Sequence, residues 1–421
     1  MMLRRVRSYM LWTVAVLLLA GCSNLPPGLQ ARLGNATAPA AAATTASTPP
    51  ASPAGQLLVQ GVDGNLYLVG RDGSQPFALT DDARASRIYT QPTWSPDGSR
   101  IAWSRIDRRG SALVTSQFDG SGRSEVRVPF APFYIAWSPR GDRLAYLSNW
   151  TVVDDSSIAL RVVEVGEEGL QAQTLADGQP FYFSWAPDGE RLLTHIGNER
   201  VEVQAVTGEQ TPVVITGGAF QSPQWAPDGG ALLYVLADAV EQLLVVMDLE
   251  GNLVQEITDF DGRITFAMSP DGSRVAYVPS AREAQANTLG PLYVLEMATQ
   301  ATRSITDRPV VAFAWSPDAQ KLAYLTLEPL PNRIGMRWNV WDGSERRAFS
   351  VFTPTSTFLS NYLPFFDQYA QSHRIWSPES DALVFTGRLA DGRSGVWVQE
   401  IAAEDAPRLL GPGLYASWSP R

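Results

Sequence analysis

Few side chains in this sequence are suited to catalysis. His195 and His373 are the only imidazoles in 421 residues, and Cys22 is the only thiol. A Ser-His-Asp nucleophile or a histidine-bound metal would have to be built from these groups. The sequence contains no G-x-S-x-G, H-E-x-x-H or C-x-x-C motif and no glycine-rich phosphate loop. We therefore expect no catalytic residues, no metal and no cofactor, and we expect His195 to be a structural histidine.

Binding chemistry is concentrated in one aromatic segment, residues 353–373. Its candidate binding residues are Phe358, Tyr362, Phe365, Phe366, Tyr369 and His373. Thr355 or Ser356 is placed to cap a short helix that carries these rings on one face, and Pro364 must kink or end that helix. Long apolar loops are more typical of functional segments than of disordered ones. Two interpretations stay open: a site for a ligand or partner, or a structural plug.

The rest of the chain is organised by a repeated phrase. Forms of W-S-P-D-G followed by a short apolar strand occur eight times, with steps of 43, 48, 40, 43, 47, 61 and 42 residues. The anchor residues are Trp94, Trp137, Trp185, Trp225, Met268, Trp315, Trp376 and Trp418. A period in the low forties is the length of one four-stranded propeller blade. The aromatic segment accounts for the long step of 61 residues.

The phrase itself predicts a tight turn between two strands. Proline presets φ, aspartate hydrogen-bonds the nearby backbone, and glycine supplies a positive φ. A third and a fourth strand follow in each repeat, so the sequence predicts an all-β propeller of eight four-stranded blades, with seven as the alternative. Three strands near 56–61, 65–70 and 76–80 precede the first phrase, and one strand at Trp418 ends the chain. We expect these N- and C-terminal strands to share one blade and close the ring.

The repeats resemble the WD-type β-propeller repeats of the TolB family over about 55–421. Met268 departs from the pattern, as do Arg140 and Glu379 in place of Asp and Ala319 and Ser380 in place of Gly. The resemblance implies a β-propeller, a fold that serves as a docking surface in some proteins. Propellers also serve as enzyme scaffolds, so the fold does not by itself imply a function.

The N-terminus predicts a lipid anchor. A basic segment, an apolar stretch and L-A-G-C ending at Cys22 resemble a bacterial lipoprotein signal peptide over 1–21. The resemblance implies acylation of Cys22. Residues 22–54 are rich in Ala, Thr, Ser and Pro and should form an extended tether, ahead of the propeller at 55–421. The expected location is the bacterial cell envelope, attached to the membrane and facing the periplasm or the exterior.

Charge and composition restrict the kinds of partner that this chain is expected to bind. The net charge is −10, which disfavours nucleic-acid binding. The favoured function is a non-enzymatic lipoprotein scaffold that docks a protein partner in the envelope. Two alternatives remain, a small-molecule or glycan-binding accessory protein and, less favoured, a hydrolase or lyase.

Overall fold

The computed structural model describes residues 48–421 apart from ten short segments. These segments are Gln75, 153–154, 167–171, Glu199, 208–212, 217–219, 238–240, 281–289, Asn332 and 403–405. The predicted signal peptide, Cys22 and most of the predicted tether lie outside the described residues. None of the helices in the described part is long and apolar enough to span a membrane.

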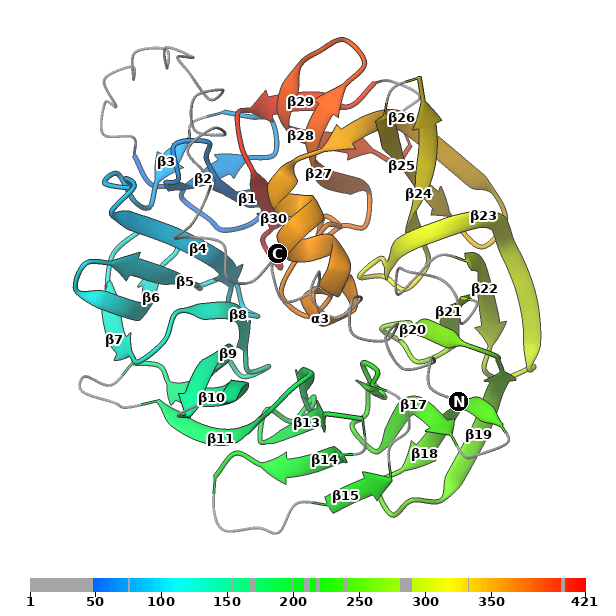
Figure 1. Ribbon diagram of the computed structural model, residues 1–421. Coiled ribbons are helices and arrows are strands. Elements are labelled where there is room, and N and C mark those ends of the chain that lie inside the picture. Colours follow the sequence, from blue (N-terminus) through cyan, green and yellow to red (C-terminus); the bar gives the residue numbers. More distant parts are fainter. Residues whose placement is uncertain are drawn as a thin grey trace, which may run out of the picture. The chain divides into compact units, whose positions relative to one another are not determined.

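The described chain is mostly β-strand, arranged in six antiparallel sheets (Figure 1). Five sheets have four strands each and one has ten. The first four-stranded sheet contains, in spatial order, β3 (Phe77–Ala78), β2 (Leu66–Gly70), β1 (Gln56–Gln60) and β30 (Tyr415–Trp418), and the second contains β4 (Arg87–Trp94), β5 (Arg100–Asp107), β6 (Gly110–Gln117) and β7 (Ser124–Val128). The third contains β11 (Gln173–Gly178), β10 (Asp155–Glu164), β9 (Arg143–Val152) and β8 (Pro132–Trp137), and the fourth contains β12 (Phe181–Trp185), β13 (Arg191–Ile196), β14 (Arg200–Ala205) and β15 (Val213–Thr216). The fifth contains β16 (Gln224–Trp225), β17 (Ala231–Ala237), β18 (Gln242–Asp248) and β19 (Leu253–Asp259).

The ten-stranded sheet is a chain of blade-like groups without a break in hydrogen bonding. Its strands run in order from β20 (Arg263–Met268) through β21 (Arg274–Ser280), β22 (Gly290–Glu296), β23 (Ala301–Trp315), β24 (Leu322–Leu330), β25 (Arg333–Trp341), β26 (Arg346–Pro354), β27 (Ala382–Leu389) and β28 (Ser394–Glu400) to β29 (Arg408–Gly411). The first part of the 15-residue β23 pairs with β22, and its end, from Val310 to Trp315, pairs with β24. One strand therefore ends one group of four and begins the next.

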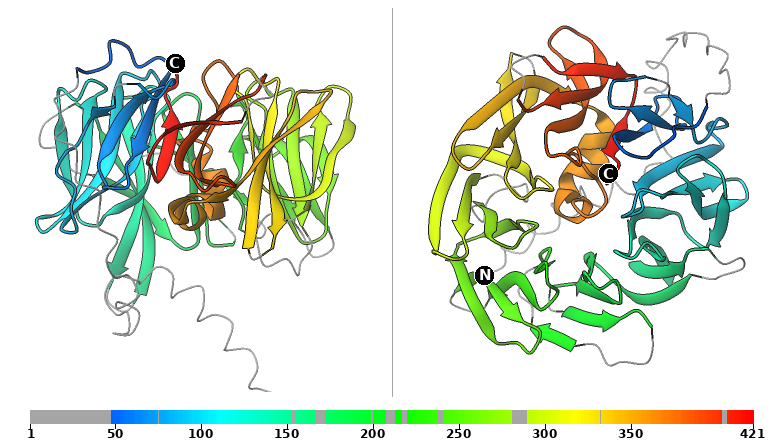
Figure 2. Two further views of the ribbon diagram at one scale, coloured as in Figure 1. Left: turned by 90° about the horizontal axis from the view of Figure 1, so that it is seen from above. Right: turned by 180° about the vertical axis from the view of Figure 1, so that it is seen from behind.

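The sheets within residues 48–421 stand around a common axis, with β4, β8, β12, β20 and β30 toward the centre (Figures 1 and 2). Four-stranded antiparallel sheets around a central axis define a β-propeller, so the prediction of an all-β propeller is confirmed. The core lies between neighbouring sheets: Ala102 and Leu113 of one sheet pack with Leu144 and Tyr146 of the next. At the chain ends, β30 pairs antiparallel with β1, with Leu57 opposite Trp418.

Each repeated phrase forms a hydrogen-bonded turn. In the first copy, Ser95 Oγ donates to Asp97 Oδ1 over 2.6 Å and accepts from the Arg100 amide over 2.9 Å, while Gly98 has φ +72°. Two of the seven copies that contain the whole turn lack this aspartate, and in both the serine donates instead to an aspartate four residues on. These pairs are Ser138 with Asp142 and Ser377 with Asp381, each at 2.7 Å.

The positive φ of the turn is kept where glycine is replaced. Ala319 has φ +60° and Ser380 has φ +58°, close to the +72° of Gly98 in the first copy. An L-residue in this region is strained, but Ser380 gains a bond because its Oγ accepts from the amide of Asp318 over 3.0 Å. The departures from the repeat therefore leave the turn geometry intact.

Anchor tryptophans join a group of strands to the group before it, between separate sheets or within the ten-stranded sheet. Five of them donate an indole N–H to the carbonyl of the residue preceding the previous anchor, over 3.0–3.4 Å. These bonds are Trp137 to Thr93, Trp185 to Ala136, Trp225 to Ser184, Trp315 to Ala267 and Trp376 to Ala314. We call this bond, with the arginine contacts described next, the inter-sheet clasp.

An arginine after the turn completes the clasp in several repeats. The Arg100 guanidinium lies 5.3 Å from the ring centre of Trp137 and donates to the Gly141 carbonyl of the next turn. Arg191 lies in the same way 5.1 Å from the ring centre of Trp225 and donates to Gly229. The flat guanidinium can stack and donate at once, which a lysine cannot do.

The copy with Met268 has no indole, and a glutamine side chain joins its sheet to the previous one. Gln224 Nε2 donates to the Phe266 carbonyl over 2.9 Å, and Gln224 Oε1 accepts from the Met268 amide over 3.1 Å. These two bonds replace the missing indole bond. The seam before β20 is therefore held by a side-chain amide.

Deleting residues 411–421 should strongly destabilise the propeller. The deletion removes β30, strips β1 of its inner neighbour and eliminates the fully buried Trp418. Loss of a buried tryptophan alone typically costs about 3–5 kcal/mol, and the exposed edge of β1 adds to it. Thermal and urea unfolding of the purified protein measure the change, with the exposed Arg421→Ala as control. An unchanged cooperative transition in the truncated chain would contradict the expected contribution of this strand.

Candidate functional site

The aromatic segment folds as three short helical turns between β26 and the next inner bridge. Phe358–Tyr362 form the π-helical turn η1, Leu363–Phe365 the 3-10 turn η2, and Phe366–Tyr369 the α-helical turn α3. Pro364 lies in η2, where it ends η1, as expected. Thr355 Oγ1 accepts from the Phe358 amide over 3.2 Å, so Thr355 caps the start. Figure 1 shows α3 near the propeller axis.

The six predicted residues are divided between a packed side and an exposed side. Tyr362 and Tyr369 are buried, and Phe358, Phe366 and His373 are half-buried. Phe365 is 53% exposed. The structure therefore brings five of the residues against the propeller wall and points Phe365 outward.

The packed side forms a cluster of rings with residues of the inner strands. Tyr362 stacks on Tyr415 of β30 with 4.7 Å between ring centres and lies 4.6 Å from Tyr369. His373 lies 4.8 Å from Tyr415, and Tyr369 meets Tyr134 of β8 edge to face at 4.9 Å. Such contacts stabilise beyond the area they bury. The segment is thus joined to both β8 and β30.

Polar side chains fix the segment in position, and two of them, Gln368 and Tyr134, were not among the predicted site residues. The Gln368 amide donates to the Phe183 carbonyl over 2.8 Å and accepts from the Phe183 amide over 3.2 Å. Tyr134 Oη donates to the Gln368 carbonyl, and Tyr369 Oη donates to the Phe133 carbonyl, each over 2.9 Å. Four bonds of this kind to β8 and β12 make the segment an ordered part of the fold.

Asp367 also has a defined role in holding the segment. Ser222 Oγ, from the connection before β16, donates to Asp367 Oδ2 over 2.5 Å. Removal from solvent raises the pKa of the Asp367 carboxyl above its usual value, although this hydrogen bond opposes the rise. Ionisation of Asp367 therefore works against the folded state.

Both histidines are neutral and have structural contacts. His373 Nε2 lies 3.0 Å from the Ala416 carbonyl, so Nε2 carries the proton. His195 is buried on β13, and its Nδ1 accepts from the Gln221 amide over 3.3 Å. Burial lowers the pKa of each imidazole to about 4. Within the described residues, no three His, Cys, Asp or Glu side chains are grouped to hold a metal ion.

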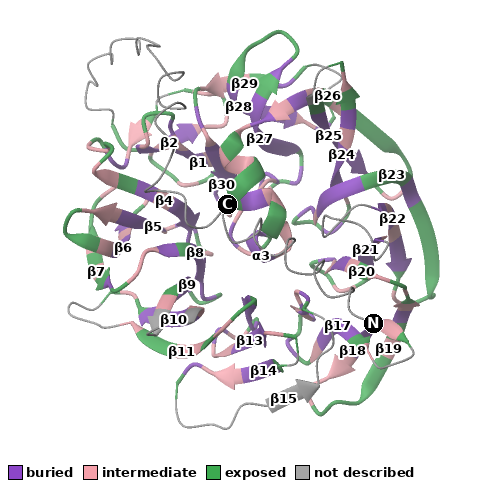
Figure 3. Ribbon diagram, in the orientation of Figure 1, coloured by how far each residue is buried: buried purple, intermediate pink, exposed green. Residues whose placement is uncertain are grey.

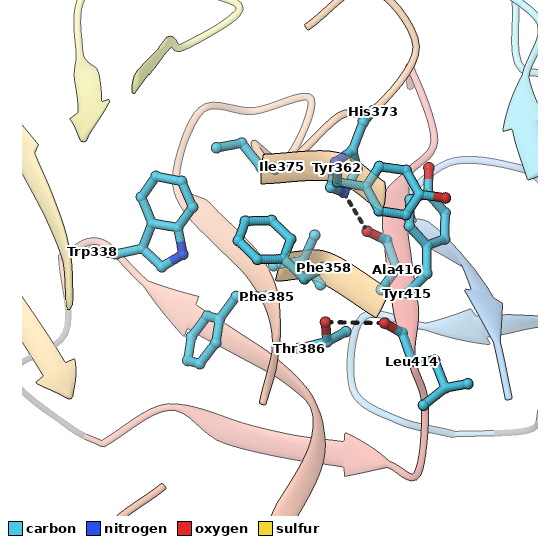
Figure 4. Close-up of a pocket in the computed structure, with 11 residues that line it drawn as sticks. Trp338, Phe358, Tyr362, His373, Ile375, Phe385, Thr386, Leu414, Tyr415 and Ala416 are labelled. Atoms are coloured by element: carbon cyan, nitrogen blue, oxygen red, sulfur yellow. Dashed lines mark hydrogen bonds between the residues drawn. The ribbon is translucent and has the colours of Figure 1, made fainter. Parts of the chain in front are cut away.

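A small cavity lies beside the segment (Figure 4). Phe358, Tyr362 and His373 line it together with Phe385 and Thr386 of β27. Its volume of about 10 Å³ is room for one water molecule. The close packing of the segment leaves this cavity too small for a sugar or a metabolite.

The strand order defines two ends of the propeller. Because consecutive strands are antiparallel, the connections after every second and every fourth strand lie at one end, together with the aromatic segment. We call this end the insertion face, and the end with the repeated Ser-Pro-Asp-Gly turns the turn face. Figure 1 looks onto the insertion face, and the left view of Figure 2 shows α3 and the C-terminus at opposite ends.

Exposed apolar side chains gather on the insertion face. Ten large apolar side chains are exposed in the described residues, and the strand order places eight of them there. They are Val62, Ile88, Phe133, Phe220, Leu236, Ile334, Leu359 and Phe365. The other two, Leu253 and Val254, begin β19 at the turn face. Within the aromatic segment, exposed residues lie on η1 and η2, next to α3 (Figure 3).

Comparisons with known proteins show likeness in fold. No family model and no curated protein matches this chain. A eukaryotic initiation factor matches at 12% identity over 88% of this chain and 99% of that chain, with a TM-score of 0.58. An oligogalacturonate lyase in complex with manganese matches at 16% identity over 68% and 85% of the two chains, with a TM-score of 0.48. TolB from Acinetobacter baumannii matches at 15% identity over 71% and 64%, with a TM-score of 0.37.

Tyr362→Ala should destabilise the protein by about 3–5 kcal/mol, because it leaves a cavity at the centre of the ring cluster. Urea unfolding of the purified protein measures this cost. Phe365→Ala is the matched control three residues away, and the exposure of Phe365 predicts a change within about 0.5 kcal/mol. Equal stability of the two variants would show that the ring cluster does not hold the segment.

Asp367→Asn should stabilise the protein at neutral pH. The folded-state pKa of Asp367 is raised, so the wild type loses stability as the pH rises through that pKa, whereas an amide cannot ionise. The gain should vanish below the ordinary aspartate pKa, where the carboxyl is protonated in both states. Melting temperatures of variant and wild type across an acid-to-neutral pH series measure it. A gain that is constant with pH would contradict this role.

Proposed function

We propose that this chain is a membrane-anchored lipoprotein of the bacterial cell envelope whose propeller is a non-enzymatic scaffold for a protein partner. The observation that carries the proposal is the gathering of exposed apolar side chains on the insertion face. Protein interfaces are built around such apolar centres, with aromatic side chains as anchors. Leu359 and Phe365 occupy the centre of this face, on the aromatic segment, and are its best candidate anchors.

In this proposal the aromatic segment has two roles: one side packs against the propeller, and the other side presents residues to a partner. Its packed side fixes the backbone, and its exposed side carries Ser360, Asn361 and Pro364 beside Leu359 and Phe365. None of these five residues is charged. Depletion of charge at the centre of a patch is a mark of protein interfaces. A preordered segment also loses little entropy on binding, which favours affinity.

The alternative functions gain less support from the same region. The cavity beside Tyr362 has room for one water, which does not suit a small-molecule or glycan ligand. Both histidines are neutral, and each has a contact with the backbone. These contacts favour structural roles over acid-base catalysis.

The direction in which the chain enters the propeller suits the anchored arrangement. β1 begins at the turn face, where the Gly55 amide donates to the Arg421 carbonyl over 3.0 Å. A tether leading to an acylated Cys22 would therefore leave from the turn face. The insertion face is at the opposite end of the propeller from the point where the chain enters β1.

We further propose eight blades in a closed ring. Support comes from the five four-stranded sheets and from the division of the ten-stranded sheet at β23 and after β26. The Trp376–Leu383 bridge supplies the inner position before β27, which makes three groups in that sheet. The pairing of β30 with β1 supports closure by a shared blade.

Replacing Leu359 and Phe365 with serine should abolish partner binding without loss of stability. The matched control replaces Leu253 and Val254, which are apolar residues at the turn face and at least as exposed. Both double variants and the wild type are affinity-purified from detergent-solubilised membranes of the native host, and co-purifying proteins are quantified. We expect a partner that the wild type and the control retain and the Leu359/Phe365 variant loses. The same recovery from all three proteins would overturn docking through the insertion face.

The anchor is tested in the same cells. Cys22→Ala should leave the chain in the soluble or unprocessed fraction, since the variant has no thiol to acylate. A Ser23→Ala chain keeps the thiol and should remain in the membrane fraction. If Cys22→Ala is still cleaved and bound to the membrane, acylation at Cys22 is wrong, although docking through the insertion face is unaffected.

A further inference from the structure

Arg161, a buried arginine on β10, has no ion pair among the described residues. Arg161 is 1% exposed. One guanidinium nitrogen, Nη1, donates to Ser148 Oγ, and the guanidinium lies 4.9 Å from the ring centre of Trp150 and 5.9 Å from that of Phe130. Aromatic faces attract a cation but carry no net charge. The positive charge of Arg161 therefore stays uncompensated by these neighbours.

Two donor groups at this place have no hydrogen-bond partner among the described protein atoms. They are Arg161 Nη2 and the hydroxyl of Tyr146, and both are buried. Tyr146 is opposite Arg161 in the β9–β10 register, so both side chains emerge on the same face of the sheet. Burial lowers the pKa of Arg161 and raises that of Tyr146 to about 12. Unpaired buried donors are costly, so a bound species is the expected explanation.

Acidic residues of the same hairpin are poorly placed to compensate Arg161. Glu164 is three residues on, which puts it on the other face of the sheet, where it lies 3.9 Å from Arg143. The backbone of Asp155 is six residues away along the same strand, a separation of about 20 Å. Glu164, the acidic residue of this hairpin with a described side-chain contact, therefore does not balance Arg161.

A second buried arginine is paired with carboxylates, whereas a third, the 8%-exposed Arg274, donates to the Ala319 carbonyl and stacks on Trp315. Arg105, on β5 of the neighbouring sheet, is 7% exposed. It forms ion pairs with Asp107 and with Glu125, the latter over 3.0 Å. Removing both charges from water is tolerated when they pair with each other. Arg161 is buried slightly more deeply than Arg105. Arg105 has two carboxylate partners, whereas Arg161 has no ion pair among the described residues.

We propose that Arg161 Nη2 and the Tyr146 hydroxyl bind a small monovalent anion of the halide class, chloride under ordinary conditions, between the β8–β11 sheet and the sheet before it. A halide accepts N–H and O–H donors and carries the single negative charge that balances one guanidinium. Carboxylate and phosphate ligands are larger, and close packing between neighbouring sheets favours the smaller ion. A water molecule would satisfy the donors but would leave the charge unbalanced.

The first test is the dependence of thermal stability on halide. Melting of the full chain is followed in sodium chloride and in sodium gluconate at equal ionic strength, because gluconate is too large to enter. Above the dissociation constant, the melting temperature of the wild type should rise by roughly 1–3 °C for each tenfold increase in chloride. Arg161→Met should lose this dependence, and Tyr146→Phe, which removes one donor, should shift it to higher chloride.

Arg105→Met is the matched control for the loss of a buried guanidinium. It removes a similarly buried charge that has its own carboxylates, so it should lower stability and keep the chloride dependence. If Arg161→Met does not fold, Tyr146→Phe and the wild type still carry the test. A wild-type melting temperature that does not differ between chloride and gluconate overturns the proposal.

The second test locates the ion. Crystals of the wild type soaked in bromide should show an anomalous peak about 3.3 Å from Arg161 Nη2, at an ordinary hydrogen-bond distance for this large anion. Crystals of Arg161→Met or of Tyr146→Phe supply the comparison, with the peak lost or weakened. An ordered water at this position without anomalous signal would overturn the proposal.

Discussion

The inter-sheet clasp is the interaction on which the rest of the propeller depends. A sheet with two apolar faces needs a neighbour on each side, but apolar packing alone sets neither the angle nor the height at which the two sheets meet. The indole bond of Trp137 to Thr93 fixes that height, because a hydrogen bond is directional. The arginine stacked on the same indole ties the turn of one sheet to the turn of the next. Repetition of this contact keeps successive inner strands at the same height along the propeller axis. The aromatic segment can contact β8, β12 and β30 together only because those strands share this height.

The aromatic segment combines two tasks that usually require separate elements. Burying Tyr362 and Tyr369 gives the segment a fixed conformation without a long helix, since three turns of different pitch each satisfy part of the backbone. The same fixed backbone carries Phe365 into solvent. Displaying an apolar ring on a rigid support lowers the entropy lost on binding, whereas the same ring on a loose loop would favour collapse onto the protein surface.

The sequence predicted the features that local chemistry determines. The turn phrase and its spacing predict the strands, the turns and the propeller, because each repeat encodes its own hairpin. Pro364 and Thr355 likewise mark the boundaries of the first helical turn. The continuous strand β23 could not be predicted. Whether strand structure is interrupted between two groups of strands depends on how those groups are placed relative to each other. Gln368 was missed because a lone amide in an apolar segment gives no sign of the backbone it will meet. The sequence also predicted the aromatic segment. The division of its rings into packed and exposed ones could not be predicted, because it depends on the strands that surround the segment.

The unbroken pairing from β20 to β29 gives the propeller an uneven stiffness around its circumference. Backbone hydrogen bonds run across the junction at β23, so bending there would stretch a ladder of peptide groups. At the junctions between the smaller sheets, neighbouring blades touch through side chains, which slide and change rotamer at far lower cost. Elastic deformation of the protein should therefore collect in the arc from β1 to β19, while the arc from β20 to β29 moves as one body. A surface that spans both arcs would have a rigid half and a deformable half. A partner bound across them would adapt its own shape to the rigid half and would deform the other half.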